Sequence, residues 1–323
     1  MCYRDKTIGV VIPAFNEELL IEDTLRSIPP YVDRIFVIDD CSKDRTAAIA
    51  GEFSKNDPRF TCISHKVNKG VGAAIITGYK RIVQEGIDIA AVMAGDNQMD
   101  PEHLPELLDP IVEGKADYTK GNRLINEEFR KGMSAWRSFG NVILTFLTKM
   151  ASGYWQLMDP QNGYTAISNR ALERIDPDTI YPWYGYCNDL LTKLNVFGFR
   201  VKDVVMPARY GKEKSKIRYG RYMFKVSWLL LKNFLWRLKM KYVWLSFHPL
   251  VLFYFFGIVL TPIGILGGLF SLYQKFILGD PLFVRGVLSL LIFIIGMQFL
   301  FFAIFFDMQT DSGSSERSAR NGM

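Results

Sequence analysis

The chain has 323 residues, of which 49% are hydrophobic, and a formal net charge of +6. This length suits one large domain with an appendage. The cysteines lie far apart, which excludes a close metal-binding pair and favours free thiols in a reducing compartment: Cys2, Cys41, Cys62 and Cys187. The apolar run near the N-terminus is too short for a signal peptide, so we expect the N-terminal domain to stay in the cytosol.

The first hundred residues alternate short apolar runs with helix-like stretches. Each run is followed by a polar or glycine-containing turn. Buried strands are predicted at residues 8–12, 35–38, 60–64 and 87–93. Asp100 and Pro101 are typical of an N-cap and a first helical position, and predict a helix to about Glu113. The alternation predicts an α/β fold with a mainly parallel sheet, whose ligands bind beyond the carboxyl ends of the strands.

The second part of this domain is less regular. Between residues 115 and 207 we predict one helix, at 138–150, and one strand, at 199–205. We expect this part to supply the second side of a cleft. Residues 1–208 are therefore assigned to one domain.

Residues 209–245 form a basic segment. Eleven Lys or Arg residues and one acid lie between positions 209 and 241. Four of the cations recur at seven-residue spacing: Arg218, Lys225, Lys232 and Lys239. Because an apolar span follows within ten residues, we interpret the segment as an interfacial helix with its cations toward lipid headgroups, rather than as an ordinary solvated helix face.

Two uncharged runs follow, at residues 250–273 and 287–306, and each is long enough to cross a bilayer. They predict a transmembrane hairpin over 246–307, with a polar, disordered tail at 308–323. The basic segment before the first span puts both ends of the hairpin on the cytosolic side. We therefore expect a multi-pass protein of the cell membrane or an endomembrane, with a cytosolic catalytic domain.

Two early motifs offer contacts for a nucleotide. Residues 11–18 read VIPAFNEE, where a buried strand ends in a polar turn. The donor-binding candidates of this turn are Pro13, Ala14, Asn16 and Glu17. Residues 37–46 read VIDDCSKDRT, and Asp40 is a further candidate because ribose and base groups need hydrogen-bond acceptors. We expect Ser42 and Asp44 to cap the following helix instead.

Two later motifs suit a diphosphate. Lys69 and Gly70 belong to NKGVGAA, a glycine-containing turn before a helix, where the backbone can approach phosphate. Asp96 and Gln98 lie in VMAGDNQMDP at a strand end. An oxygen pair at this spacing can hold Mg²⁺ or Mn²⁺ together with a diphosphate. Such an ion would neutralise a nucleoside diphosphate as it leaves.

In this order and spacing the four motifs resemble the catalytic domain of glycosyltransferase family 2, and within it the dolichyl- or polyprenyl-phosphate sugar synthases. The resemblance covers residues 7–220 and the two-span anchor. It implies a GT-A (Rossmann-like) fold and sugar transfer from a nucleotide sugar to a polyprenyl phosphate. One departure concerns the metal turn, where the synthases carry Asp-Ala-Asp-x-Gln and this chain has Ala94 in place of the first acid. Asp96 and Gln98 remain as the implied metal ligands.

The resemblance also assigns the acceptor side. It implies that Arg123, in Gly-Asn-Arg, and Arg137, fourteen residues later, grip the lipid phosphate. Guanidinium groups match phosphate oxygens and stay charged. The stretch RYGKEKSK resembles R-x-x-G-x-S-K, which implies that Arg209 and Lys216 contact the donor and Ser215 the acceptor phosphate.

The turn DPQNGY resembles the Asp-x-x-x-Gly-aromatic turn that lies near the sugar in the family. Asp159 at its start and Asp189 are candidates for binding sugar hydroxyls. The acceptor would be a phosphate monoester with a second pKa of about 6, so it can attack the anomeric carbon without a general base. No histidine is therefore given a catalytic role.

The resemblance implies a single displacement with inversion, for which Asp96, Arg123 and Arg137 are the catalytic candidates. We expect a nucleotide sugar, a polyprenyl or dolichyl phosphate and the lipid bilayer as partners, with no nucleic acid; a homo-oligomer stays open. The donor is left open among GDP-mannose, UDP-glucose and UDP-N-acetylglucosamine. Three alternatives also stay open: a processive polysaccharide synthase, a transferase acting on a lipid-linked glycan, and a non-catalytic nucleotide-sugar-binding scaffold.

Overall fold

The computed structural model describes residues 3–123, 135–207, 219–245, 248–279, 281 and 283–320, without the side chains of 135–139, 141, 219–222 and 311–320. The chain forms two compact units. The first ends at Phe234, and the second runs from Leu235 to Arg320.

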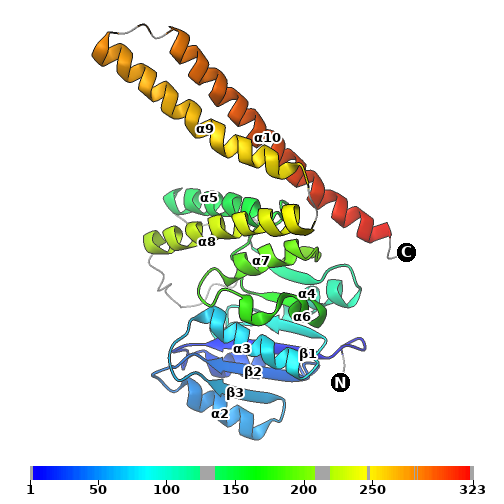
Figure 1. The fold of residues 1–323 in the computed structure, drawn as a ribbon. Coiled ribbons are helices and arrows are strands. Elements are labelled where there is room, and N and C mark those ends of the chain that lie inside the picture. The colour runs from blue at the N-terminus through cyan, green and yellow to red at the C-terminus, as the bar shows by residue number, and fades with distance from the viewer. Residues whose placement is uncertain are drawn as a thin grey trace. The chain divides into compact units, whose positions relative to one another are not determined.

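The first unit is built on a seven-stranded sheet in the order β3-β2-β1-β4-β6-β5-β7. Figure 1 labels β1, β2 and β3. Its strands are β1 (Ile8–Ala14), β2 (Arg34–Asp39), β3 (Phe60–Ser64), β4 (Ile89–Val92), β5 (Tyr118–Asn122), β6 (Thr165–Ser168) and β7 (Val201–Val205). Only β6 runs antiparallel to its neighbours, β4 and β5. The predicted α/β fold with a mainly parallel sheet is confirmed.

Helices cover both faces of this sheet (Figure 1). The helices of the chain up to Lys239 are α1 (Ile21–Ser27), α2 (Thr46–Asn56), α3 (Val71–Gln84), α4 (Leu104–Val112), α5 (Ala135–Ser152), α6 (Asn169–Ile175), α7 (Tyr186–Val196) and α8 (Tyr219–Lys239), and the last residues of α8 belong to the second unit. Side chains along a strand point alternately to opposite faces, so successive residues enter different cores. Val10 and Ile12 pack in the core under α1 and α4, whereas Val11 packs in the core under α3 and α7.

The predicted helix start at Asp100 is confirmed, with one difference. Asp100 is the N-cap, and its Oδ1 accepts a hydrogen bond from the Glu102 amide at 3.1 Å. The first turn, Pro101–His103, is a 3₁₀ helix, after which α4 continues to Val112. Strands β5 and β6 and helices α6 and α7 have no counterpart in the sequence prediction. Their short lengths and buried polar residues hide the apolar periodicity on which that prediction depends.

The second unit contains two long apolar helices, α9 (Leu250–Tyr273) and α10 (Phe283–Arg320). A π-helical turn, Gln274–Leu278, extends α9 beyond the predicted span. By length and composition the stretches Leu250–Leu278 and Phe283–Thr310 of these helices suit a membrane crossing. They form a hairpin (Figure 1).

Glycines let the two hairpin helices approach closely. A Cβ added at Gly264 would lie 2.5 Å from the backbone nitrogen of Phe293, and one at Gly296 would lie 2.6 Å from that of Thr261. Small residues at such contacts are typical of helices that pack within a bilayer.

The prediction of a disordered tail after residue 307 is wrong through Arg320. Helix α10 continues to that residue. Adding residues to an existing helix avoids the cost of nucleation, so the apolar span extends into a polar sequence that would not form a helix alone.

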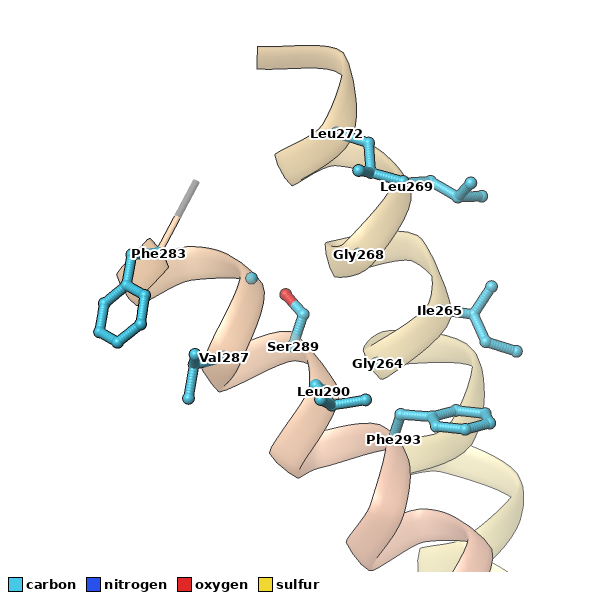
Figure 2. A pocket seen from close by; sticks show the side chains of 11 residues that line it. Gly264, Ile265, Gly268, Leu269, Leu272, Phe283, Val287, Ser289, Leu290 and Phe293 are labelled. Atoms are coloured by element: carbon cyan, nitrogen blue, oxygen red, sulfur yellow. The ribbon is translucent and has the colours of Figure 1, made fainter. Parts of the chain in front are cut away.

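An apolar cavity of about 550 Å³ lies between α9 and α10 (Figure 2). Gly264, Gly268 and Gly286 line it without side chains, and Ser289 is the one polar residue among those that line it. None of the site residues predicted from the sequence lines this cavity. Space left by glycine between two apolar helices therefore accounts for it.

Candidate active site

The first, second and fourth motifs meet at the carboxyl edge of neighbouring strands. β1 lies between β2 and β4 in the sheet, so the turns that follow them are adjacent. The Asp40 amide donates to the carbonyl of Ala14 at 2.9 Å, and the Gly95 amide donates to that of Pro13 at 3.2 Å. The backbone thus brings Pro13 and Ala14 between the Asp40 turn and the Asp96 turn.

The turn after β1 is fixed to the start of α2. Asn16 has a positive φ of 56°, and its amide donates to Ser42 Oγ at 2.9 Å. In return, the Lys43 amide donates to Asn16 Oδ1 at 2.9 Å. The Glu17 amide donates to Thr46 Oγ1 at 2.8 Å. Asn16 is therefore held by hydrogen bonds in both directions, and Glu17 by its backbone amide alone.

The prediction that Ser42 and Asp44 cap α2 is wrong in detail, because the N-cap is Arg45, without a side-chain hydrogen bond, and Ser42 accepts from Asn16 instead. Asp44 lies two residues before α2 and contacts its first residue. Its Oδ1 accepts from the amide and the hydroxyl of Thr46, at 3.0 and 2.6 Å. Burial raises the pKa of Asp44, but these hydrogen bonds outweigh it and hold the pKa below its usual value. The carboxylate satisfies backbone groups that the helix leaves without partners.

Asp40 is buried, with 3% of its surface exposed, and its carboxylate shapes the next loop. Oδ1 accepts from the Lys69 amide at 2.9 Å and contacts His65 Nδ1 at 2.8 Å, while Oδ2 accepts from the Gly70 amide at 2.8 Å. A carboxylate only accepts, so Nδ1 of His65 carries a proton toward it. The structure thus directs both oxygens of Asp40 into the protein.

His65 is a residue that the sequence analysis passed over. Its Nε2 contacts Thr77 Oγ1 on α3 at 2.9 Å, so the ring joins Asp40 to that helix. Gly70 has a φ of 94°, and a Cβ there would lie 2.6 Å from Cε3 of Trp183. The loop therefore needs glycine for both its conformation and its packing. Nothing local in the sequence marks His65, because its partners are distant along the chain.

Asp96 and Gln98 lie together just beyond β4. The Gln98 amide donates to Asp96 Oδ1 at 3.1 Å, and Asn97 between them has a positive φ of 56°. Within the described part of the chain, no group of three or more His, Cys, Asp or Glu is placed to hold a metal ion. One carboxylate and one amide oxygen do fit Mg²⁺ or Mn²⁺ when substrate phosphates supply further ligands.

Arg123, predicted to bind the acceptor phosphate, follows β5 directly. Its Nε donates to Asp159 Oδ2 at 3.0 Å, while 41% of its side chain stays exposed. The terminal nitrogens of this guanidinium have no partner within the described residues. Asp159 itself is almost fully buried. The carboxylate therefore fixes the Nε side of the guanidinium group, while part of the side chain stays exposed.

Asp189 is directed inward. It forms an ion pair with Lys193, and its Oδ2 accepts from the Tyr181 amide at 2.9 Å. Both ions are buried in α7 and its surroundings. Asp189 is thus joined to the 181–185 segment, and no contact joins it to Arg123 or Asp159 within the described residues.

Four predicted residues lie outside what the structure describes. Arg137 is in the first turn of α5, but its side chain is not among the described ones. Arg209, Ser215 and Lys216 lie between residues 207 and 219, also outside the described ranges. These assignments remain predictions from the sequence.

An open α/β sheet with polar turns gathered beyond its strands suits an enzyme that binds a nucleotide-linked substrate at that edge. The chain belongs to glycosyl transferase family 2, whose sequence pattern it matches over residues 9–176. Both the predicted family and the predicted enzyme class are confirmed.

Two relatives illustrate the similarity. The UDP-N-acetylglucosamine–dolichyl-phosphate N-acetylglucosaminyltransferase of Methanococcus voltae is 32% identical over 218 residues, which cover 62% of this chain and 86% of the relative. The polyprenol monophosphomannose synthase of Mycolicibacterium smegmatis is 31% identical over 207 residues, covering 60% of this chain and 74% of the relative.

Among solved structures, the fold resembles glucosyl-3-phosphoglycerate synthase from Mycobacterium tuberculosis, in complex with Mn²⁺, UDP-glucose and phosphoglyceric acid. The TM-score is 0.54 at 22% identity, over 72% of this chain and 80% of that one. This likeness confirms the predicted GT-A-like fold and carries no information on substrate.

Proposed function

We propose that this glycosyltransferase transfers one sugar from a nucleotide sugar to a polyprenyl or dolichyl phosphate at the cytosolic face of a membrane. The observation that carries the proposal is Arg123, whose Nε is held by Asp159 while its side chain stays partly exposed at the end of β5. A guanidinium so held suits a phosphate acceptor. The printed names of both relatives, which specify dolichyl phosphate and polyprenol monophosphomannose, support the same acceptor class.

On the donor side, Asp96 and Gln98 would hold Mg²⁺ or Mn²⁺ together with the diphosphate. The ion would supply positive charge to the leaving nucleoside diphosphate. Pro13, Ala14 and the loop at Gly70 would surround the nucleotide. Because both oxygens of Asp40 are directed to that loop and to His65, we assign Asp40 to shaping the loop rather than to contacting the base.

On the acceptor side, Arg123 and Arg137 would neutralise the ionised lipid phosphate and align it with the anomeric carbon. Arg209, Ser215 and Lys216 would close over the two phosphates. An oxygen of the lipid phosphate attacks the anomeric carbon. The bond from that carbon to the nucleoside diphosphate breaks as the new bond forms, so the anomeric configuration is inverted. Asp159 acts through Arg123 in this scheme, and we assign Asp189 to the packing of α7 rather than to the sugar.

The surface of α8 supports attachment to a membrane. Phe224, Trp228 and Leu231 recur at helical spacing and are 78%, 60% and 47% exposed. Lys225 and Lys232 are exposed beside them. An apolar stripe flanked by cations is typical of a helix at the bilayer surface. Together with the two spans, it favours a multi-pass membrane enzyme with a cytosolic catalytic unit.

The decisive experiment offers GDP-mannose, UDP-glucose and UDP-N-acetylglucosamine separately, with a polyprenyl phosphate and Mg²⁺ or Mn²⁺. Mass spectrometry of the lipid product should show one added sugar from one donor. The name of the Methanococcus voltae relative makes UDP-N-acetylglucosamine the first donor to test. A ladder of products would identify a processive synthase, and no product with any donor would favour the scaffold.

Two variants test the named roles. Arg123→Ala should lower kcat/KM for the polyprenyl phosphate by about 100-fold, because a charged donor to the reacting phosphate is lost. Asp96→Asn should instead reduce activity in a way that depends on the concentration of the divalent ion. Arg26→Ala is a matched control, because Arg26 is exposed on α1 and pairs with Glu22. Equal activity of Arg123→Ala and Arg26→Ala would contradict the assignment.

A further inference from the structure

Lys120 is a fully buried lysine beside the candidate acceptor site, and the proposed function does not yet use it. It lies in the middle of β5, and 0% of its surface is exposed. Its Nζ has no hydrogen-bond partner within the described residues. Burying a charge in this way is costly, and an apolar side chain of similar length would avoid that cost.

The strand register places a carboxylate next to this lysine. Lys120 is directly opposite Asp203 on β7, and directly opposite Thr165 on β6. Side chains of directly opposed residues lie on the same face of a sheet. Asp203 Oδ1 is also buried without a hydrogen-bond partner within the described residues. A buried cation and a buried acceptor thus lie on the same face of two adjacent strands.

The other oxygen of Asp203 organises the acceptor side. Oδ2 accepts from the Met158 amide at 2.8 Å and from Asn122 Nδ2 at 2.9 Å. Asn122 precedes Arg123, and Met158 precedes Asp159. Asp203 therefore holds both segments whose next residues form the Arg123–Asp159 pair.

The pKa values of Lys120 and Asp203 depend on the charges of their neighbours. Burial lowers the pKa of the Lys120 ammonium, and the carboxylates of Asp159 and Asp203 oppose that change. Burial raises the pKa of Asp203, and Lys120 opposes it. Without the cation, two carboxylates would remain near each other with reduced solvation. Repulsion between them would act directly on the turn that orients Arg123.

We propose that Lys120 is a positioning residue for the phosphate acceptor: its ammonium balances Asp159 and Asp203 and so holds Arg123 in the orientation that receives the phosphate. This inference rests on the proposed function. Lys120 is buried and does not itself touch the acceptor. It acts through the two carboxylates, the Met158 amide and the Asn122 side chain.

The test is a double-mutant cycle of Lys120→Met and Asp203→Asn in the full-length membrane-reconstituted protein. The KM for polyprenyl phosphate, the KM for the nucleotide sugar, kcat and the melting temperature are measured for each variant. Lys120→Met should raise the acceptor KM about tenfold and leave the donor KM within about twofold. Lys202→Met, an exposed lysine on β7, is the matched control.

The double variant removes both charges and should recover an acceptor KM within about threefold of the wild type. A lower melting temperature of Lys120→Met with an unchanged acceptor KM would show a purely structural role and overturn the inference. Equal increases in both KM values would do the same. If Lys120→Met does not fold, the comparison shifts to Asp203→Asn alone, whose acceptor KM must exceed that of the double variant.

The wild-type arm separates this inference from the function on which it rests. Single-sugar transfer by the wild type, combined with additive effects of the two substitutions, would reject the role of Lys120 and keep the function. A wild type that transfers no sugar to polyprenyl phosphate from any donor would reject the function and the inference together.

Discussion

Two buried cations, one in each unit, meet their surroundings in different ways. Arg237 in the second unit is 0% exposed, and its two terminal nitrogens donate to the two oxygens of Asp307 at 2.8 and 2.7 Å. Tyr242 also donates its hydroxyl to Asp307 Oδ1 at 2.6 Å. Lys120 in the first unit is equally buried, yet its Nζ has no hydrogen-bond partner within the described residues.

The difference follows from the shape of the two cations and from what each is placed to do. A guanidinium is a planar fork that matches a carboxylate with two parallel hydrogen bonds, whereas an ammonium is a compact charge. The Arg237 cluster is closed, and it ties the last turns of α8 to α10. Around Lys120, by contrast, Lys120 Nζ and Asp203 Oδ1 have no hydrogen-bond partner within the described residues. We call Lys120, Asp203 and Asp159 the open cluster. Buried polar groups without partners are expected more often near functional sites than in purely structural contacts.

Breaking the closed cluster should give the largest effect. Asp307→Ala leaves Arg237 buried without its carboxylate and should lower the free energy of unfolding by about 3–5 kcal/mol. Chemical denaturation of the detergent-solubilised protein measures this loss. Asp23→Ala, an exposed acid on α1, should change it by no more than about 0.5 kcal/mol. Similar values for the two variants would contradict a structural role for the Asp307 pair.

Replacing Arg237 by lysine, the kind of cation found at position 120, should lower the free energy of unfolding by a smaller amount. Arg237→Lys keeps the charge but loses the two-pronged hydrogen bond to Asp307, so we expect a loss of about 1–3 kcal/mol. The same denaturation experiment measures it. A variant as stable as the wild type would mean that charge alone holds α8 to α10, and the comparison with Lys120 would lose its basis.

The first half of the sheet was predictable from the sequence because local patterns decide it. In β1, Val10, Val11 and Ile12 are all buried, and the polar turn that follows marks the strand end. β5 gives no such signal, because it carries Lys120 and Asn122 inside the protein. The antiparallel direction of β6 is set by its neighbours β4 and β5, which a local pattern does not report.

The candidate site was predictable in its residue types but not in the direction of its side chains. Asp40 and Asp189 both look like ligands in the sequence. The groups that engage Asp40 include His65 and Gly70, and their proximity depends on the packing of α3 against the sheet. Asp189 pairs with Lys193 one helical turn later, a contact as compatible with a surface helix as with the buried α7.

Weakening the contact between Asp159 and Arg123 tests the proposed orientation of Arg123 without changing Lys120. Asp159→Asn keeps an acceptor for Arg123 Nε but removes the charge that holds it. We expect the KM for polyprenyl phosphate to rise about tenfold, which corresponds to about 1.4 kcal/mol, with the donor KM unchanged. Steady-state kinetics with each substrate varied in turn measures both. A rise in the donor KM alone would favour the direct contact of Asp159 with the sugar that the family resemblance implies.

The pH dependence of stability should show the smallest effect. Because burial raises the pKa of Asp203 above its ordinary value of 3.8, the folded protein holds this proton to higher pH than the unfolded chain. The stabilisation from the protonated group is complete below about pH 3.8 and is lost as pH rises through the folded-state pKa. Asp203→Asn removes that proton, so the wild type should lose stability relative to the variant as pH rises across this window. If the free energies of unfolding of the two proteins changed in parallel with pH, Asp203 would have the same pKa in the folded protein and in the unfolded chain. Burial would then not disfavour its charge, and Asp203 would resemble Asp307, the fully paired partner of Arg237.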